Sequence, residues 1–148
     1  MTALEVPPGS PRRLLLVSDD VASAEALRAH LVRHGFVVGL ASSPRTAASA
    51  ARETEPVVVL VDAAIAGGWQ SVAVALDPLL PRSRIAVLAA YWSTDARRLA
   101  EEAGIGGILL KQLEGHALVV RLHELGDAVA SDGGTPSPRA AGITGGAS

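Results

Sequence analysis

Short apolar runs alternate with longer amphipathic stretches along the 148-residue chain. Five runs have the length and composition of strands buried on both faces, and they cover 14–17, 36–41, 57–61, 85–89 and 107–110. The stretches between and after them predict helices at 22–34, 44–55, 70–77, 95–103 and 114–130. Strict alternation of strand and helix requires a parallel sheet with right-handed crossovers and helices on both faces. The predicted fold class is therefore α/β.

Local signals set the ends of several of these elements. Gly35 is expected to close the first helix as its C′ residue, and Gly104 to end the fourth. Ser43-Pro44 combines a capping hydroxyl with a first-turn proline, so a helix should begin there. Pro56 should stop that helix, because the residue before a proline is pushed out of the helical region. The run 57–61 is the richest in β-branched residues and is expected at the centre of the sheet.

Composition narrows the function classes. Residues 1–11 and 131–148 lack periodicity and are expected to be a disordered leader and a low-complexity tail, which leaves one domain at 12–130. A net charge of −2 offers no field to recruit nucleic acid or an anionic membrane. The absence of cysteine excludes thiol catalysis and cysteine-ligated metals. No apolar run is long enough for a membrane span and no secretory signal is visible, so a cytoplasmic location is expected.

Charged residues follow three of the predicted strands. Asp19 and Asp62 come after the first and third strands, and Lys111, the only lysine of the chain, comes after the fifth. Parallel strands bring such residues to one edge of the sheet, where α/β proteins bind ligands. Two carboxylates suit Mg²⁺, a carboxylate can act as a nucleophile, and a lysine is a point charge for a phosphoryl group. The alternative is that the aspartates cap loops and the lysine is solvated, but three charges in this order favour a site.

These residues stand in segments that resemble the receiver domains of bacterial two-component response regulators. The segment 14–20 is similar to the first strand and acidic cluster of that family, and 35–36 to the glycine–aromatic pair after its first helix. The segment 57–62 resembles the third strand with its phosphoacceptor aspartate, and 103–111 the stretch that leads to a lysine. The resemblance covers about 12–130. It implies a doubly wound, five-stranded, flavodoxin-like sheet of order 2-1-3-4-5.

The resemblance also implies roles for the charged residues. Asp62 would accept a phosphoryl group from a sensor histidine kinase or a phosphotransfer protein. Asp19, Asp62 and the backbone carbonyl of Ala64 would bind Mg²⁺, and Lys111 would pair with the phosphoryl oxygens. The only chemistry expected of the chain is phosphorylation and dephosphorylation of Asp62 itself. Its output would pass to a protein partner that docks on the last helix, the fourth helix and the fifth strand.

Four positions depart from the pattern of the family. Ser18 stands where a second acid is usual, which should weaken Mg²⁺ binding unless Asp20 turns into the site. Ala89 replaces the hydroxyl residue at the end of the fourth strand, and Ile108 replaces the aromatic partner of that hydroxyl. Gln112 replaces the proline after the lysine, so a cis peptide is not expected there. These degenerate switch positions leave a second hypothesis open: a pseudo-receiver that binds partners without phosphorylation.

Other residues allow more than one interpretation. A small α/β enzyme acting on a phosphorylated metabolite is a weaker hypothesis, because no general base accompanies the carboxylates. Trp69 and Trp92 follow strands, so they are candidates either for positions near the site or for a partner-binding surface. His30 and His34 have helical i, i+4 spacing, but without a third ligand a solvated or half-buried pair is favoured over a metal site.

Overall fold

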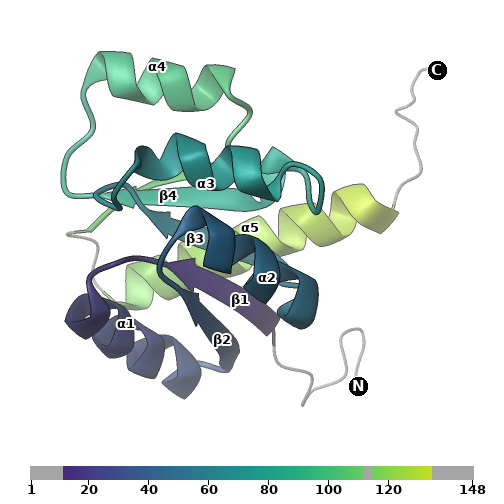
Figure 1. The fold of residues 1–148 in the computed structure, drawn as a ribbon. Coiled ribbons are helices and arrows are strands. Elements are labelled where there is room, and N and C mark those ends of the chain that lie inside the picture. Colours follow the sequence, from purple (N-terminus) through teal and green to yellow (C-terminus); the bar gives the residue numbers. More distant parts are fainter. Residues whose placement is uncertain (1–11, 112–114, 135–148) are drawn as a thin grey trace.

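The structure, a computed structural model, describes residues 12–111 and 115–134. Five parallel strands form one sheet of order β2-β1-β3-β4-β5 (Figure 1). The strands are β1 (Arg12–Val17), β2 (Phe36–Ala41), β3 (Val58–Asp62), β4 (Ile85–Ala89) and β5 (Gly107–Leu110). The helices are α1 (Val21–Arg33), α2 (Pro44–Thr54), α3 (Gly68–Leu76), α4 (Thr94–Glu102) and α5 (Gly115–Gly134). The predicted fold class and strand order are confirmed, and β3 lies at the sheet centre as expected.

The larger differences from the predicted bounds are in β1, α3 and α5, and strand β1 begins at Arg12 rather than at residue 14. Helix α3 begins at Gly68 rather than at residue 70, because Gly67 has a φ of 86° and turns the chain into the helix two residues earlier. Helix α5 continues through 131–134, where a tail was expected, because extending an existing helix costs little per residue. A short 3-10 turn, η1 (Arg82–Arg84), precedes β4 and was not predicted. The expected leader at 1–11, the rest of the tail and Gln112 lie outside the described residues.

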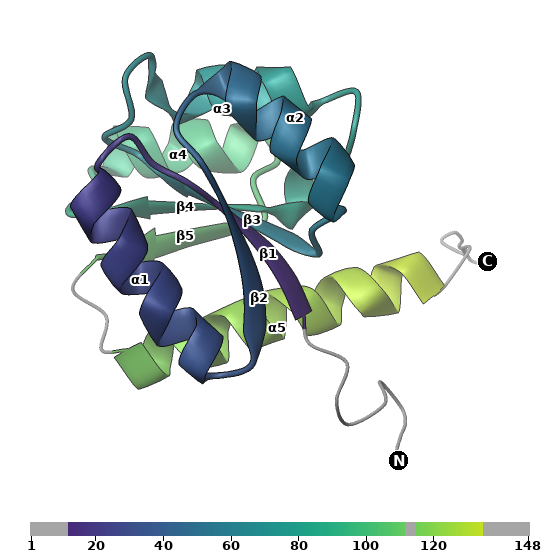
Figure 2. The same ribbon diagram turned by 60° about the horizontal axis from the view of Figure 1, so that its bottom comes forward.

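Helices cover both faces of the sheet, so the core has two halves (Figure 2). Helices α2, α3 and α4 cover one face, and α1 and α5 cover the other. Successive side chains of a strand point to opposite faces. In β3, for example, Val59 and Val61 therefore enter the α2–α3–α4 core, while Val58 and Leu60 enter the α1–α5 core. The same alternation decides which polar side chains at the strand ends can meet.

The helix ends follow the local signals in the sequence. Gly35 has a φ of 95°, as a C′ residue requires. Ser43 and Thr46 form a reciprocal capping box at the start of α2. Glu55 ends α2 in the left-handed conformation directly before Pro56. None of the helices in the described ranges is long and apolar enough to cross a membrane.

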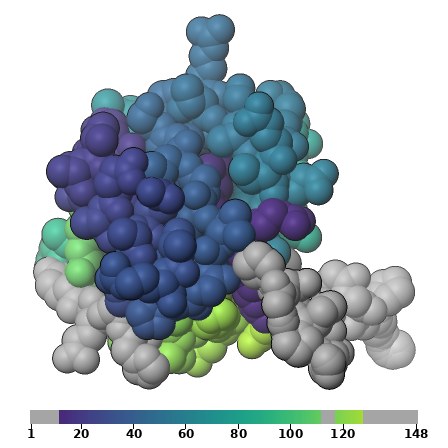
Figure 3. All heavy atoms as spheres, turned by 90° about the horizontal axis from the view of Figure 1, so that it is seen from below, coloured from purple at the N-terminus to yellow at the C-terminus, as the bar shows by residue number. Residues whose placement is uncertain are grey.

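Arg12 connects β1, at the start of the described fold, to α5 at its end. Its Nη1 donates to the carbonyl oxygen of His123 at 3.2 Å, and its Nη2 pairs with Asp127. Gly126 leaves space for the guanidinium, because a Cβ at this position would overlap Nη1. The His123 ring stacks on Phe36 with 4.8 Å between ring centroids. Figure 3 shows this side of the molecule, on which the purple-to-blue atoms of α1 and β2 border the yellow-green atoms of α5.

Candidate functional site

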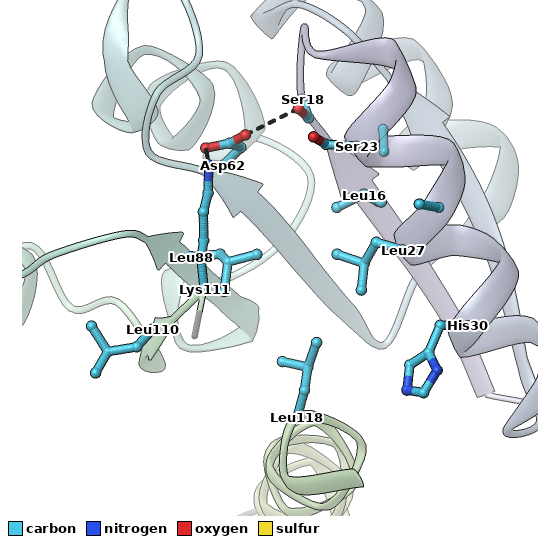
Figure 4. Close-up of a pocket in the computed structure, with 12 residues that line it drawn as sticks. Leu16, Ser18, Ser23, Leu27, His30, Asp62, Leu88, Leu110, Lys111 and Leu118 are labelled. Carbon is cyan, nitrogen blue, oxygen red and sulfur yellow. Dashed lines mark hydrogen bonds and ion pairs between the residues drawn. The ribbon is translucent and has the colours of Figure 1, made fainter. Parts of the chain in front are cut away.

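Asp62 lies at the carboxyl edge of the sheet and accepts three polar contacts (Figure 4). Lys111 Nζ is 3.0 Å from Asp62 Oδ1, and the Ala64 N–H donates to the same oxygen at 2.9 Å. The Ser18 hydroxyl donates to Asp62 Oδ2 at 3.1 Å. Asp62 is 6% exposed, whereas the Lys111 side chain is 37% exposed. The buried carboxylate is thus held by an ammonium that reaches it from the solvent side.

The strand alternation explains why these three side chains meet. Leu60 and Leu109 belong to the α1–α5 core, so Asp62 and Lys111, two residues further on, point to the same side. Ser18 continues the β1 ladder through its N–H bond to Ala41. Ser18 lies two residues after Leu16, which points into the α1–α5 core, so the Ser18 side chain points to the same side. The sequence alternation therefore places Ser18, and not its neighbour Asp19, beside Asp62.

The other two acids of the predicted cluster have different partners. Asp19 has the opposite parity and is exposed, and its Oδ2 accepts from the Ala66 N–H at 2.9 Å in the loop between β3 and α3. Asp20 caps α1 by accepting from the Ser23 N–H at 3.2 Å and from the Ser23 hydroxyl at 2.9 Å. The hydroxyl bond is the main cause that lowers the pKa of Asp20. Turning Asp20 toward Asp62 would break this cap.

Asp19 and Asp62 are the two carboxylates predicted to bind a divalent cation. Mg²⁺ binds one or two carboxylates and keeps several waters. Asp62 supplies one carboxylate at the site, whereas the Asp19 side chain is held by the Ala66 N–H. In the described ranges, no group of three or more His, Cys, Asp or Glu side chains comes together. Ligation of Mg²⁺ by Asp19, Asp62 and the Ala64 carbonyl therefore remains a prediction.

Apolar residues occupy the two switch positions of the strands. Ala89 is buried, and its carbonyl oxygen accepts from the Lys111 N–H at 2.9 Å. Ile108 is half-buried and packs against the α2–α3–α4 core. The Trp92 Nε1–H donates to the Leu109 carbonyl oxygen at 3.0 Å, which ties the β4–α4 loop to β5. The side-chain hydrogen bond from the β4–α4 loop to β5 is therefore made by an indole rather than by a hydroxyl.

The prediction that Trp69 belongs to a partner-binding surface is wrong. Its side chain is 8% exposed and belongs to the α2–α3–α4 core, because the early start of α3 turns it inward. His30 and His34 face each other with 4.5 Å between ring centroids, and His34 Nδ1 lies 3.0 Å from the His30 carbonyl oxygen.

A pocket of about 430 Å³ opens directly beside Asp62, between α1, the carboxyl ends of β4 and β5, and α5. We call it the α1–α5 pocket. The described residues that line it are Leu16, Ser18, Ser23, Ala24, Ala26, Leu27, His30, Asp62, Leu88, Leu110, Lys111 and Leu118. In Figure 4, Asp62 and Ser18 lie at one end of this pocket and His30 at the other. Neither the pocket nor the Ser18–Asp62 bond was predicted, although strand alternation alone indicates on which side of the sheet Ser18 lies.

The sequence itself matches no protein-family model, and it matches no curated protein. The fold, in contrast, matches solved receiver domains. A structure described as that of a response regulator from Chloroflexus aurantiacus superposes with a TM-score of 0.70 at 27% identity, covering 80% of this chain and 99% of that one. The chain has the fold of a response-regulator receiver domain.

Two further structures extend the likeness to this receiver fold. The BeF3-activated receiver domain of Klebsiella pneumoniae RstA has a TM-score of 0.69 and 23% identity, over 78% of this chain and 98% of that one. The Vibrio cholerae chemotaxis protein CheY4 has a TM-score of 0.68 and 20% identity, over 78% and 99%. These structures are covered almost completely, so the likeness extends over the whole receiver fold.

Proposed function

We propose that this chain is a divergent receiver domain in a phosphorelay, with Asp62 as the phosphoacceptor. The observation that carries this proposal is the 3.0 Å contact between Lys111 Nζ and Asp62 Oδ1, at the carboxyl edge of the central strand of a receiver fold. A lysine held at this distance is placed to neutralise a phosphoryl group on the same carboxylate. The donor would be the phosphohistidine of a sensor kinase or of a phosphotransfer protein.

The transfer would rest on positioning and charge neutralisation. One oxygen of Asp62 attacks the phosphorus atom, the bond between phosphorus and the donor histidine nitrogen breaks, and that nitrogen keeps the electron pair. Lys111 then pairs with the phosphoryl oxygens, and the Ala64 N–H holds the carboxylate in place. Asp19 and Asp62 would hold Mg²⁺, which when bound neutralises charge on the phosphoryl oxygens.

A second function, that of a pseudo-receiver, is favoured by the bond from Ser18. The hydroxyl of Ser18, the ammonium of Lys111 and the N–H of Ala64 together satisfy both oxygens of Asp62. A carboxylate satisfied in this way has less need of a cation. The chain would then present its surface to a partner in one fixed state. We rank this function second, because it leaves the pairing of Asp62 with the only lysine of the chain unexplained.

Beryllofluoride, the mimic that activates the Klebsiella RstA receiver domain, separates the two functions. With millimolar Mg²⁺ and beryllofluoride, the proposed function requires amide NMR shifts around Asp62 and Lys111, and Asp62→Asn should abolish them. Absence of shifts in the unmodified protein would refute phosphorylation at Asp62. Because Ala89 and Ile108 replace the switch pair, the shifts should stay near the site, and large shifts along α5 would contradict this point.

An acid placed at position 18 tests whether Ser18 limits the affinity of the site for Mg²⁺. Ser18→Asp places a second carboxylate beside Asp62, so Mg²⁺ affinity should rise by about tenfold or more, as expected when a hard cation gains a carboxylate ligand. Ser49→Asp is the matched control, because it adds the same charge at an exposed position of α2. Equal Mg²⁺ affinities in both variants would show that position 18 does not limit the metal site.

Such a domain would act on a protein partner through a docking surface. Large apolar side chains are exposed on the three elements where docking was predicted: Leu99 on α4, Leu110 on β5 and Val120 on α5 are each at least 40% exposed. Replacing Leu99 by Glu should weaken a partner complex more than replacing Val37 by Glu on the opposite edge strand. Equal effects would refute this surface.

A further inference from the structure

The α1–α5 pocket has the size of a small-molecule site. Its volume of about 430 Å³ lies within the range of roughly 300–1,000 Å³ typical of ligand pockets. Of the twelve described residues that line it, seven are Leu or Ala, and the polar ones are concentrated near Asp62. A ligand with an apolar body and one polar end would match this distribution of lining residues. The inference below rests in part on the proposed function, because the pocket shares Lys111 with the phosphoacceptor site.

The polar end of the pocket has unused donor capacity. A lysine ammonium has three N–H donors, and in the described part of the chain Asp62 is the side chain that Nζ contacts. Asp62, in contrast, already accepts from Lys111, Ala64 and Ser18. A ligand that enters this end therefore meets free donors on a cation and an acid that is already satisfied. Such an end favours an anionic acceptor.

The far end of the pocket has one unsatisfied polar atom. His30 Nε2 is buried and finds no hydrogen-bond partner among the described residues. A buried nitrogen without a partner costs about 1–3 kcal/mol. His30 lines the pocket opposite Asp62 (Figure 4). An apolar ligand body that reaches His30 would pack against its ring, and a ligand with a polar group at that end would also supply the missing partner.

We propose that the α1–α5 pocket binds a small amphipathic carboxylate. Its carboxylate accepts from the free N–H donors of Lys111, its apolar body lies along Leu27 and Leu118, and its far end reaches His30. A phosphoryl group on Asp62 needs the same Lys111 donors. Ligand and phosphoryl group therefore weaken each other's binding by the same factor, as thermodynamic linkage requires. The pocket makes phosphorylation of Asp62 sensitive to a metabolite.

Three probes separate the possible ligands. Octanoate has the charge and the apolar body, octanol keeps the body without the charge, and acetate keeps the charge without the body. In amide NMR titrations of the full chain, octanoate should bind about tenfold more tightly than either of the others, as a charge-assisted hydrogen bond gives. Equal binding of octanoate and octanol would overturn recognition of an anion. Equal binding of octanoate and acetate would overturn the proposal that the pocket binds the apolar body of the ligand.

Variants assign the binding to named residues. Lys111→Met keeps the stem of the side chain and should reduce octanoate affinity to that of octanol. Leu27→Trp fills the pocket from α1 and should reduce octanoate affinity at least tenfold. Val32→Phe is the matched control, because Val32 is an exposed residue of α1 outside the pocket, and it should leave octanoate binding unchanged. A loss in Val32→Phe equal to that in Leu27→Trp would overturn the assignment.

Beryllofluoride distinguishes failure of this inference from failure of the proposed function. If beryllofluoride perturbs Asp62 and octanoate does not bind, the pocket proposal fails and the receiver function stands. If octanoate binds as described and beryllofluoride has no effect, the receiver function fails and the pocket stands. If both bind, saturating octanoate should weaken beryllofluoride at least fivefold, and simultaneous binding without this effect would overturn the shared use of Lys111.

Discussion

The ion pair between Asp62 and Lys111 lends itself to a double-mutant cycle. Lys111→Met removes the ammonium and keeps an apolar stem, which leaves the buried Asp62 carboxylate with only the Ala64 N–H and the Ser18 hydroxyl. Asp62→Asn removes the negative charge with little change in size. The double variant contains neither charge, so it should lose less stability than the sum of the two single variants.

The structure sets the size of this difference. Opposite charges 4 Å apart interact by about 1 kcal/mol in water and about 4 kcal/mol at an effective dielectric constant of roughly 20. Asp62 is buried, but the Lys111 side chain is more than one third exposed, so solvent screens the pair and the lower part of this range applies. We expect Lys111→Met to lower the free energy of unfolding by about 1–2 kcal/mol and the coupling energy of the cycle to be of similar size.

Urea unfolding of the four proteins at pH 7 measures the coupling. The exposed pair between Arg98 and Asp95 on α4 is the matched control, with side chains 63% and 82% exposed. The corresponding cycle, with Arg98→Met and Asp95→Asn, should give less than about 0.5 kcal/mol. A coupling energy between Asp62 and Lys111 no larger than that of the control would refute the buried ion pair.

Three further predictions concern stability, each measured by urea unfolding. Gly106→Ala should cost at least about 2 kcal/mol, because a Cβ would be 2.7 Å from the Ser83 carbonyl carbon; a loss below 0.5 kcal/mol, roughly that of a surface change, would contradict this packing. Burial, and secondarily the Arg12 guanidinium, lower the pKa of His123 from its usual 6.5, so stability should fall as the pH drops below 6.5 toward the lower folded-state pKa. His123→Phe should flatten this slope, and an unchanged slope would exclude His123 as its source. Trp92→Phe should cost about 1 kcal/mol through the lost bond to β5, and no loss would show that this bond does not stabilise the fold.

Much of the fold follows from the sequence alone, because its signals are local and repeated. Each strand is a short apolar run, and features such as Gly35 and Ser43-Pro44 set helix ends by conformation and capping. The errors occurred where one signal competed with another. The glycine at 67 started α3 early, and the poor helix formers at 131–134 did not stop α5.

The candidate site was predicted less completely, because its geometry depends on side-chain direction. The strand ends indicated that Asp62 and Lys111 share an edge, and the structure brings them into contact. From the sequence, Ser18 is interpreted as the position of a missing acid, whereas its place in the strand alternation makes it the partner of Asp62. The position of Asp19 depends on a loop N–H at Ala66, which no sequence pattern indicates. The α1–α5 pocket arises from the packing of distant elements and has no sequence signal.

The two core halves have consequences for how this chain folds during synthesis. The α2–α3–α4 half is complete in sequence by the end of β5, whereas the α1–α5 half still lacks Leu118 and Leu122. A nascent chain paused at this point would expose one apolar face of a finished sheet, which makes it a target for chaperones. Only when α5 leaves the ribosome can Arg12 reach the carbonyl of His123. Release of the last helix, rather than formation of the sheet, should therefore mark the moment at which the newly made protein becomes safe from aggregation.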